Sequence, residues 1–340
     1  MLYVGLDLHT KHITSCVLNS DGKLHDRWQV QQVDQLVERL TRFQQPFKVT
    51  YEAGCGYGRF HELLSPIAAE VMVANPGQLR LIYGSKKKND RRDAENLAKL
   101  LYLDAIPMVH VPSADVRAWR ELIVFRHRLT EKTTRSKNGL RALLRTLVIR
   151  PPRTPGLWTL EGLIWLKTLE LPHPLQAFRR NVLVDELESL KRQIALVEQE
   201  LARFSEGNAA IRRLRTIPGV GPRTAEAVVA FLDDPHRFQN SKQIGDYFGL
   251  VPCQDQTGSK NRLGHITRDG SATVRQLLTE AAWQATQRSP TVRAYFERIH
   301  KGDKNRRKIA LTATAHYLAR VMWSMLVKET DWQEQIPAGG

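Results

Sequence analysis

The first nine residues, Met1-Leu-Tyr-Val-Gly-Leu-Asp7-Leu-His9, alternate in character as a β-strand does. One face would carry only aliphatic side chains, those of Leu2, Val4, Leu6 and Leu8. Tyr3, Gly5 and Asp7 fall on the other face. Because successive side chains of a strand point to opposite faces, the pattern predicts a strand that ends near a lone acid, Asp7.

The residues that follow this strand alternate between strand and helix patterns. Strands are predicted over residues 12–18, 24–30, 48–52 and 70–74, and helices over 33–44 and 57–68. The Asp21-Gly22 pair marks a turn before the third strand. Three β segments followed by a helix–strand–helix–strand order predict an α/β domain with a mixed sheet.

Length and charge limit the class of protein. The chain has 340 residues, which favours two or three domains, and 42% of them are apolar, which argues against a disordered chain. The 51 Lys and Arg exceed the 35 Asp and Glu, giving a formal net charge of +16. Such a charge predicts a polyanionic partner, nucleic acid first and an anionic membrane surface second.

Cysteine usage and the N-terminus indicate the compartment. The three cysteines are odd in number and far apart, which excludes a disulfide framework and a CxxC zinc module. The N-terminus lacks a basic region before an apolar one, and no apolar run approaches the ~18 residues of a membrane span. We therefore expect a soluble cytoplasmic protein with no membrane partner.

The middle of the chain is more basic than the rest. Residues 81–153 contain 17 Lys or Arg against 7 Asp or Glu, so a nucleic-acid surface is expected there, with Lys86, Lys87 and Lys88 as candidate contacts. Helical patterns run over 113–205, with a Pro-rich break at 150–156. A 3–4 spacing of apolar residues from Leu187 to Leu201 fits either a bundle core or a coiled coil with another subunit.

Four carboxylates stand where a sheet could bring them together. Asp7 and Glu52 end the first and fourth strands, and Asp90 and Asp93 open a predicted helix and share one of its faces. If the two strands are neighbours, the four acids converge at one sheet edge, where hard oxygen ligands suit Mg²⁺ or Mn²⁺. Each acid alone could instead cap a helix or end a strand.

Two further segments suggest contacts with phosphate. The sequence Ile217-Pro-Gly219-Val-Gly221-Pro-Arg223 predicts a tight turn before a helix, and Gly219, Gly221 and Arg223 would bind a backbone phosphate as in a helix-hairpin-helix element. A plain αα-hairpin turn without a bound phosphate is the alternative. The polar loop after residue 249, within residues 245–273, reads as a solvated surface loop, but its hydroxyls with Lys260, Arg262, His265 and Arg268 could also attack or hold a phosphate.

Taken together, these motifs resemble those of the DEDD transposases of bacterial insertion sequences, of the insertion-sequence-110 type, which act as bridge-RNA-guided DNA recombinases. The resemblance covers nearly the whole chain. Its carriers are Gly5-Leu-Asp7, Tyr51-Glu52-Ala-Gly54, Asn75-Pro76, Lys88-Asn-Asp90-Arg-Arg-Asp93-Ala, Ile217-Pro-Gly-Val-Gly221, Gly249-Leu-Val-Pro252 and Arg262-Leu-Gly264-His-Ile-Thr.

The resemblance implies an architecture and a chemistry. It implies a RuvC-like, RNase-H-type catalytic domain over 1–110, a helical coiled-coil region over 111–208 and a mostly α-helical transposase domain over 209–335. Asp7, Glu52, Asp90 and Asp93 match the acids that bind two Mg²⁺ or Mn²⁺ ions. A bridge RNA, element-end DNA, target DNA and a homo-oligomer, a dimer or a tetramer, are the implied partners in a bacterial cytoplasm.

The sequence departs from the family at the nucleophile. The family places a serine just before a glycine of the C-terminal loop, whereas this chain has Thr257 before Gly258 and Ser259 after it. A threonine hydroxyl can attack a phosphodiester, although its methyl group crowds the attack. We expect Thr257 to be the nucleophile, with Ser259 as the fallback and a slow or inactive copy as a further possibility.

Three functions remain open at this stage. An RNA-guided recombinase that exchanges strands through a covalent hydroxyl–phosphate intermediate is preferred. A Mg²⁺-dependent junction-resolving nuclease would need only the four acids and water. A catalytically inactive scaffold that binds RNA and DNA would need neither the acids nor the hydroxyl.

Overall fold

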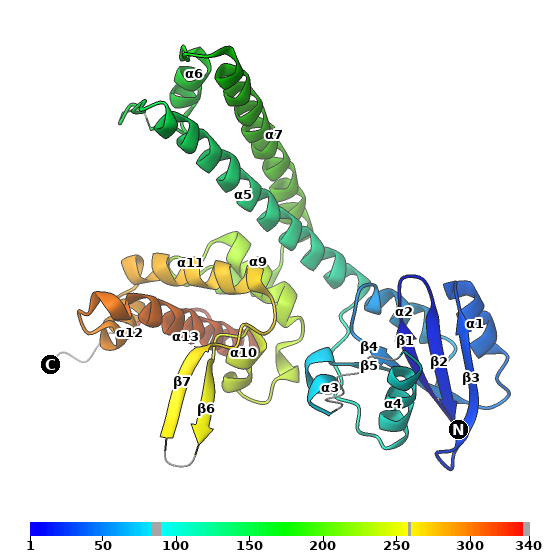
Figure 1. Ribbon diagram of the computed structural model, residues 1–340. Helices are drawn as coiled ribbons and strands as arrows, with labels where there is room; N and C mark the ends of the chain where they lie inside the picture. Colours follow the sequence, from blue (N-terminus) through cyan, green and yellow to red (C-terminus); the bar gives the residue numbers. More distant parts are fainter. Residues whose placement is uncertain (83–89, 155, 258–259, 336–340) are drawn as a thin grey trace. The chain divides into compact units, whose positions relative to one another are not determined.

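The computed structural model describes residues 1–82, 90–154, 156–257 and 260–335 (Figure 1). The chain divides into two compact units, Met1–Arg117 and Ala118–Gly340. The finer division into three domains at residues 110 and 208 stays a prediction. Lys86, Lys87, Lys88, Gly258 and Ser259 lie outside the described residues.

The N-terminal unit is built on one five-stranded sheet. Its strands are β1 (Leu2–Leu8), β2 (Ile13–Leu18), β3 (Leu24–Val30), β4 (Phe47–Glu52) and β5 (Glu70–Ala74), in the spatial order β3-β2-β1-β4-β5. The pairs β1–β2 and β2–β3 are antiparallel, whereas β1–β4 and β4–β5 are parallel. The predicted mixed sheet is therefore confirmed, with β1 at its centre.

Helices cover both faces of this sheet (Figure 1). On one face, Val4 and Leu6 of β1 pack with helices α1 (Val33–Thr41) and α2 (Tyr57–Leu64) in an apolar core. On the other face lies α4 (Asp90–Tyr102), whose Ala94 and Ala98 pack with Cys16 and Leu18 of β2. Helix α3 (Pro76–Ile82) precedes α4 along the chain. The period-two pattern of β1 thus assigns Asp7 to the face that α4 covers.

Gly5 brings α4 into contact with the backbone of β1. A Cβ atom at residue 5 would lie 2.2 Å from the carbonyl oxygen of Ala94 and 2.4 Å from the amide nitrogen of Ala98. No side chain fits in that space, so the absence of a side chain at Gly5 sets the distance between strand and helix. This close packing places the first turn of α4 beside the end of β1.

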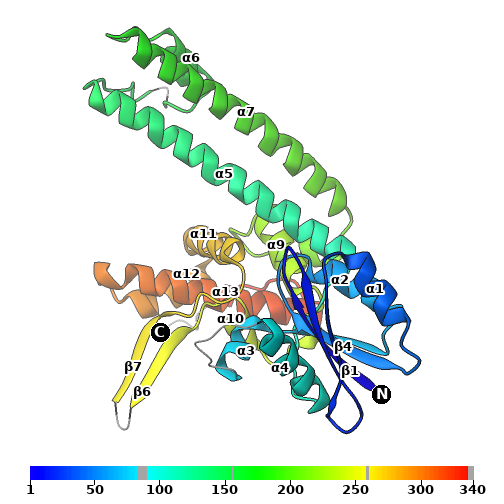
Figure 2. The same cartoon turned by 45° about the vertical axis from the view of Figure 1, so that its right-hand side comes forward.

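The C-terminal unit contains a long helical hairpin. Helix α5 (Ala114–Thr146), whose first four residues belong to the N-terminal unit, ends before the predicted Pro-rich break, and α6 (Leu160–Thr168) and α7 (Pro174–Phe204) follow it. Helices α5 and α7 run side by side in both views (Figures 1 and 2). Ser136 donates a 2.9 Å hydrogen bond to Glu186, and Arg126 pairs with Glu198, so the two helices are antiparallel. Leu187 of the apolar seam packs with Leu140 and Leu144 of α5, and Leu201 belongs to the main core of the C-terminal unit, so these two seam residues pack within this chain.

Helices also form the rest of the C-terminal unit. They are α8 (Ala209–Leu214), α9 (Pro222–Leu232), α10 (Ser241–Tyr247), α11 (Ala272–Arg288), α12 (Pro290–His300) and α13 (Arg307–Lys328), with two short 3₁₀ turns, η1 (Pro235–Arg237) and η2 (Lys304–Arg306). Their core is continuous with the base of the hairpin, because Trp119 of α5 and Leu201 of α7 belong to it. The predicted mostly helical character is confirmed.

One segment differs from its prediction as a loop. Residues 252–266 form an antiparallel pair, β6 (Pro252–Thr257) and β7 (Lys260–Ile266). The composition suggested a solvated loop because the stretch has few apolar residues. Backbone hydrogen bonds define an antiparallel pair of strands, and a polar composition does not exclude them.

Candidate active site

Three of the four predicted acids meet at the end of β1. Carboxylate oxygens of Asp7, Asp90 and Asp93 all lie within 4.8 Å of one another, and all three residues are half-buried. Asp7 comes from the face of β1 that α4 covers, and Asp90 and Asp93 form the first turn of α4. Because one helical turn separates the two helix acids, both side chains point toward the same place.

Two histidines that the sequence analysis did not select join this cluster. The imidazole Nε2 of His9 lies 3.0 Å from an Asp7 oxygen and 3.3 Å from an Asp90 oxygen. The Nε2 of His12 lies 3.1 Å from the other Asp90 oxygen. His9, His12 and Asp90 form a second group with the spacing of metal ligands. The available signal was the position of both histidines in the turn just after the Asp7 strand.

The protonation equilibria reflect this crowding. Burial raises the pKa of the Asp7 carboxyl, the hydrogen-bonded His9 lowers it, and the charges of Asp90 and Asp93 raise it again. The hydrogen bond from His12 holds the pKa of Asp90 below its usual range. Repulsion among carboxylates therefore acts on Asp7, and a divalent cation with hard oxygen ligands would relieve it. The donor set fits Mg²⁺ or Mn²⁺.

Glu52 lies on the neighbouring strand. The parallel register pairs Leu6 with Tyr51, so the next step along both strands brings Asp7 and Glu52 to equivalent positions on one sheet face. Glu52 is exposed, and it belongs to neither of the two ligand clusters found among the described residues. The structure thus brings three of the predicted acids together and places Glu52 at the same sheet edge.

In the turn before α9, the first glycine, Gly219, mainly allows close packing against another helix. Gly219 has a φ of +98°, and a Cβ there would lie 2.5 Å from the amide nitrogen of Ala285 in α11. Only glycine fits that approach. At Gly221, in contrast, an added Cβ would meet nothing within 4 Å. Gly221 is therefore the glycine of this turn that a phosphate could approach.

Arg223 is already paired inside the protein. Its Nη2 lies 3.0 Å from Oε1 of Glu226, which is only 1% exposed and also accepts a hydrogen bond from Ser205. Burial raises the pKa of Glu226, and Arg223 opposes that shift. The buried acid reduces the charge that Arg223 can offer to a phosphate.

Thr257 is the last residue of β6, where its backbone pairs with Lys260 of β7. Arg268 lies beyond β7, exposed and with a φ of +61°. The side chains of Thr257, Lys260 and Arg262 are among those of residues 255–263, which the structure does not describe. Their roles stay predictions.

None of the helices in the described part of the chain is long and apolar enough to cross a membrane.

Comparison with known proteins gives the family. Residues 4–149 match a family model described as "Transposase", the DEDD transposase of IS110, and residues 211–297 match the model "Transposase IS116/IS110/IS902 family". A probable family 20 transposase of Pseudomonas aeruginosa is 31% identical over 256 residues, which are 74% of this chain and 75% of that protein.

Two further relatives cover more of the chain. The transposase for insertion sequence element IS1111A of Coxiella burnetii is 27% identical over 84% of this chain and 79% of its own length. The transposase for insertion sequence element IS1328 of Yersinia enterocolitica is 26% identical over 96% and 97%. The chain therefore belongs to the IS116/IS110/IS902 family of transposases, which are DNA recombinases.

Proposed function

We propose that this protein is the RNA-guided recombinase of an insertion sequence, and that it cuts and rejoins DNA strands at the cluster of Asp7, Asp90 and Asp93. The observation that carries the proposal is the convergence of these three carboxylates at the end of the central strand. A transposase needs one place where a phosphodiester can be attacked, and clustered acids that bind divalent cations are suited to that chemistry.

The fold supports an RNase-H-type, RuvC-like assignment of the N-terminal unit. Three antiparallel strands continue into two parallel ones, and the central strand carries the first acid. The second acid, Glu52, ends the adjacent strand β4. The last two acids lie on a helix that packs against the central strand through Gly5.

Asp7, Asp90 and Asp93 would hold the divalent cation, and Glu52 would complete a two-ion site. Bound Mg²⁺ or Mn²⁺ lowers the pKa of an attacking hydroxyl and offsets charge on the phosphate. The residues of the chain have their own tasks. His12 hydrogen-bonds Asp90, and His9 contacts both Asp7 and Asp90, so the imidazoles orient the carboxylates.

The nucleophile in this proposal is the Thr257 hydroxyl. Its oxygen forms a bond to phosphorus, the DNA phosphodiester bond breaks, and the departing DNA oxygen takes a proton to become a hydroxyl. A hydroxyl of the second DNA strand then attacks the phosphothreonine and releases Thr257. Each transfer conserves the number of phosphate ester bonds, so strand exchange needs no external energy source.

The nucleic-acid partners follow from charge and from the family. The net charge of +16 suits a guide RNA together with two DNA partners. In the C-terminal unit, a cavity of about 290 Å³ at the start of α9 is lined by Arg212 and Arg215, by the paired Arg223 and Glu226, and by Glu206. Arg212 and Arg215, together with the open space at Gly221, support a helix-hairpin-helix type of phosphate contact at this turn.

The test is a covalent adduct between protein and DNA. The chain is purified with its co-purifying nucleic acid, which is sequenced to identify the guide, and is incubated with element-end DNA and Mg²⁺. We expect an adduct that peptide mapping assigns to Thr257, lost in Thr257→Ala and kept in Thr257→Ser. Ser259→Ala is the matched control and should retain the adduct.

The other outcomes distinguish the alternatives. Cleaved DNA without any adduct would show a nuclease that uses water. Binding with neither cleavage nor adduct would show an inactive scaffold. An adduct mapped to Ser259 would transfer the role of nucleophile to that residue.

A further inference from the structure

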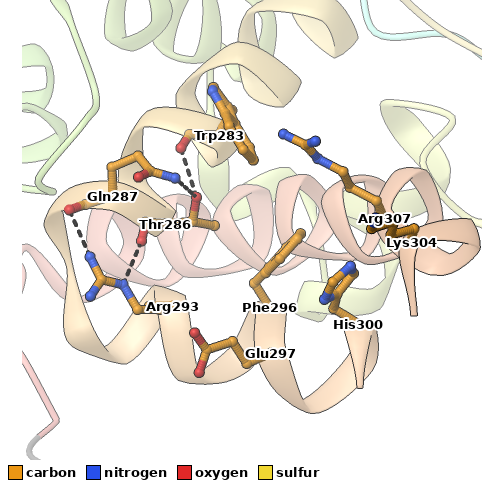
Figure 3. Close-up of a pocket in the computed structure, with 9 residues that line it drawn as sticks. All are labelled: Trp283, Thr286, Gln287, Arg293, Phe296, Glu297, His300, Lys304 and Arg307. Atoms are coloured by element: carbon orange, nitrogen blue, oxygen red, sulfur yellow. Dashed lines mark hydrogen bonds between the residues drawn. The ribbon is translucent and has the colours of Figure 1, made fainter. Parts of the chain in front are cut away.

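The C-terminal unit has a cavity that the proposed catalysis does not use. It has a volume of about 670 Å³ and is formed by α11, α12, η2 and the start of α13 (Figure 3). This volume lies within the range of small-ligand sites, which is roughly 300–1,000 Å³. Its lining combines flat aromatic groups with cations and one carboxylate.

Two stacked pairs of flat side chains line the cavity. The Arg307 guanidinium lies over the Trp283 ring, 4.6 Å from its centroid. The rings of Phe296 and His300 are stacked at 5.2 Å, with an interplanar angle of 18°. Figure 3 shows Trp283 and Arg307 side by side, with Phe296 and His300 across from them. A planar ligand could lie between the two pairs.

The polar groups of the cavity are divided between its ends. Lys304 and Arg307 lie together at one end, and Glu297 lies toward the other (Figure 3). Within the described part of the chain, neither Lys304 nor Arg307 has a carboxylate at ion-pair distance. Arg293, in contrast, donates 2.9 Å hydrogen bonds to the carbonyls of Thr286 and Gln287, so its guanidinium holds the end of α11.

The sequence concentrates positive charge at the cationic end. Residues 301–308 contain five Lys or Arg and one Asp. The single acid, Asp303, caps η2 by accepting a 2.8 Å hydrogen bond from the amide of Asn305. Its carboxylate is therefore engaged locally, and the positive field at the cavity mouth is left for a ligand.

A nucleotide satisfies all of these features at once. A base can stack between flat side chains, a phosphate can contact Lys304 and Arg307, and Glu297 can accept hydrogen bonds from a base amino or imino group. An apolar ligand would leave the cations unpaired. An acidic peptide would not use the aromatic faces and would meet Glu297. The combination of stacking and cationic contacts is typical of single-stranded nucleic acid recognition.

We propose that the cavity between α11, α12 and η2 binds one unpaired nucleotide of a single-stranded nucleic acid. The base stacks between the Trp283–Arg307 and Phe296–His300 pairs, and its phosphate contacts Lys304 and Arg307. RNA and single-stranded DNA share this chemistry, and both can supply the nucleotide. The inference does not depend on the acidic cluster or on Thr257.

The first measurement is binding of short fluorescent RNA and DNA oligonucleotides of one sequence to the full chain, in EDTA so that no cleavage occurs. Loss of one stacking partner in Phe296→Ala should weaken binding by roughly 5- to 150-fold. Phe178→Ala, an exposed phenylalanine of α7, is the matched control and should leave binding unchanged. Tighter binding of one oligonucleotide would identify RNA or DNA as the source.

The second measurement separates the phosphate contact from general charge. Log affinity falls linearly as log salt rises. Lys304→Ala and Arg307→Ala should each make this fall less steep, by ~0.7 in the magnitude of the slope. Lys308→Ala removes an exposed charge that does not line the cavity and should lower affinity less.

Cross-linking of the unmodified protein keeps the test independent of variant folding. Iodouracil-containing oligonucleotides should cross-link to Trp283, Phe296 or His300. Cross-links only outside residues 283–307, or pocket variants that bind like their controls, would overturn the proposal.

Discussion

The substitution Gly5→Ala tests how the fold builds the acidic cluster. Gly5 lies two residues before Asp7 on β1, and its missing side chain lets α4 approach. The new Cβ would lie 2.2 Å from the oxygen of Ala94, the residue after Asp93. All three atoms nearest to this Cβ are backbone atoms of α4, so no side chain can move aside to make room.

The magnitude follows from these distances. Ordinary van der Waals contact begins at 3.4 Å, so α4 has to retreat from β1 by about 1 Å. Overpacking of this kind costs ~1–3 kcal/mol of unfolding free energy, and the lower freedom of the unfolded Ala chain returns ~0.4–1 kcal/mol. A 1 Å error between catalytic groups costs ~10²-fold in rate. We expect a net loss of about 1–2 kcal/mol and a ~10²-fold lower cleavage rate.

The assays are urea unfolding followed by circular dichroism, DNA cleavage in Mg²⁺, and Mn²⁺ binding followed by electron paramagnetic resonance. Gly54→Ala is the matched control, because its added Cβ would be 4.0 Å from its nearest neighbour, the carbonyl oxygen of Glu52. Weaker Mn²⁺ binding by Gly5→Ala but not by Gly54→Ala would link the strand–helix distance to the site. Wild-type stability and wild-type cleavage in Gly5→Ala would refute the reasoning.

Three other substitutions extend the test to the rest of the chain. Asp93→Ala should abolish strand exchange, and full activity of this variant in Mg²⁺ would exclude a shared metal site. The same substitution should change the unfolding free energy by less than ~1 kcal/mol, because it removes a favourable helix-dipole contact but also a charge that repels Asp7. Gly219→Ala should lower the unfolding free energy in urea by ~1–3 kcal/mol because the new Cβ would clash with the backbone of α11. Gly221→Ala, which has open space around it, should lower the unfolding free energy by less than ~1 kcal/mol, and equal losses would contradict the packing described. Burial raises the pKa of Glu226 above its usual 4.5, so the unfolded state loses this proton at a lower pH than the folded state, and folding stability should fall as pH rises from 4.5 through the raised value. Glu226→Gln should remove this part of the pH dependence in unfolding curves, and an unchanged profile would show that Glu226 does not cause it.

Periodicity was sufficient for the five strands and for α1, α2 and α4 of the N-terminal unit, whereas the short helix α3 was not predicted. The alternating pattern of β1 and the spacing of Leu36 and Leu40 both reflect burial on one face, and a one-face pattern is visible in a single sequence. The hairpin β6–β7 was not predicted because its strands pair through backbone hydrogen bonds, which the polar composition of the segment does not reveal. The partner of the apolar seam in α7 was also open, since the spacing of apolar residues does not identify the helix that covers them; in the structure Leu187 packs with Leu140 and Leu144 of α5.

The acids of the site could be selected from the sequence because a carboxylate at a strand end and two on one helical turn form a local pattern. The distances between the acids could not be predicted, because these distances depend on how closely α4 packs on β1. Gly5 controls that packing through a contact with residues some ninety positions away. His9 and His12 were missed because their role comes from Asp90, which reaches them only after folding. Arg223 was expected to face a phosphate, although Glu226 follows it by three residues on α9, and this local i,i+3 spacing already indicated their ion pair.

The sequence by itself determined the element order, the basic character and the identity of the candidate acids, because these depend on composition and local spacing. The tertiary structure alone decided which acids meet, which glycine serves packing, and where Trp283, Phe296, Lys304 and Arg307 form a cavity. Those outcomes depend on contacts between segments that are distant in sequence, and local patterns carry no information about the distance at which such segments pack.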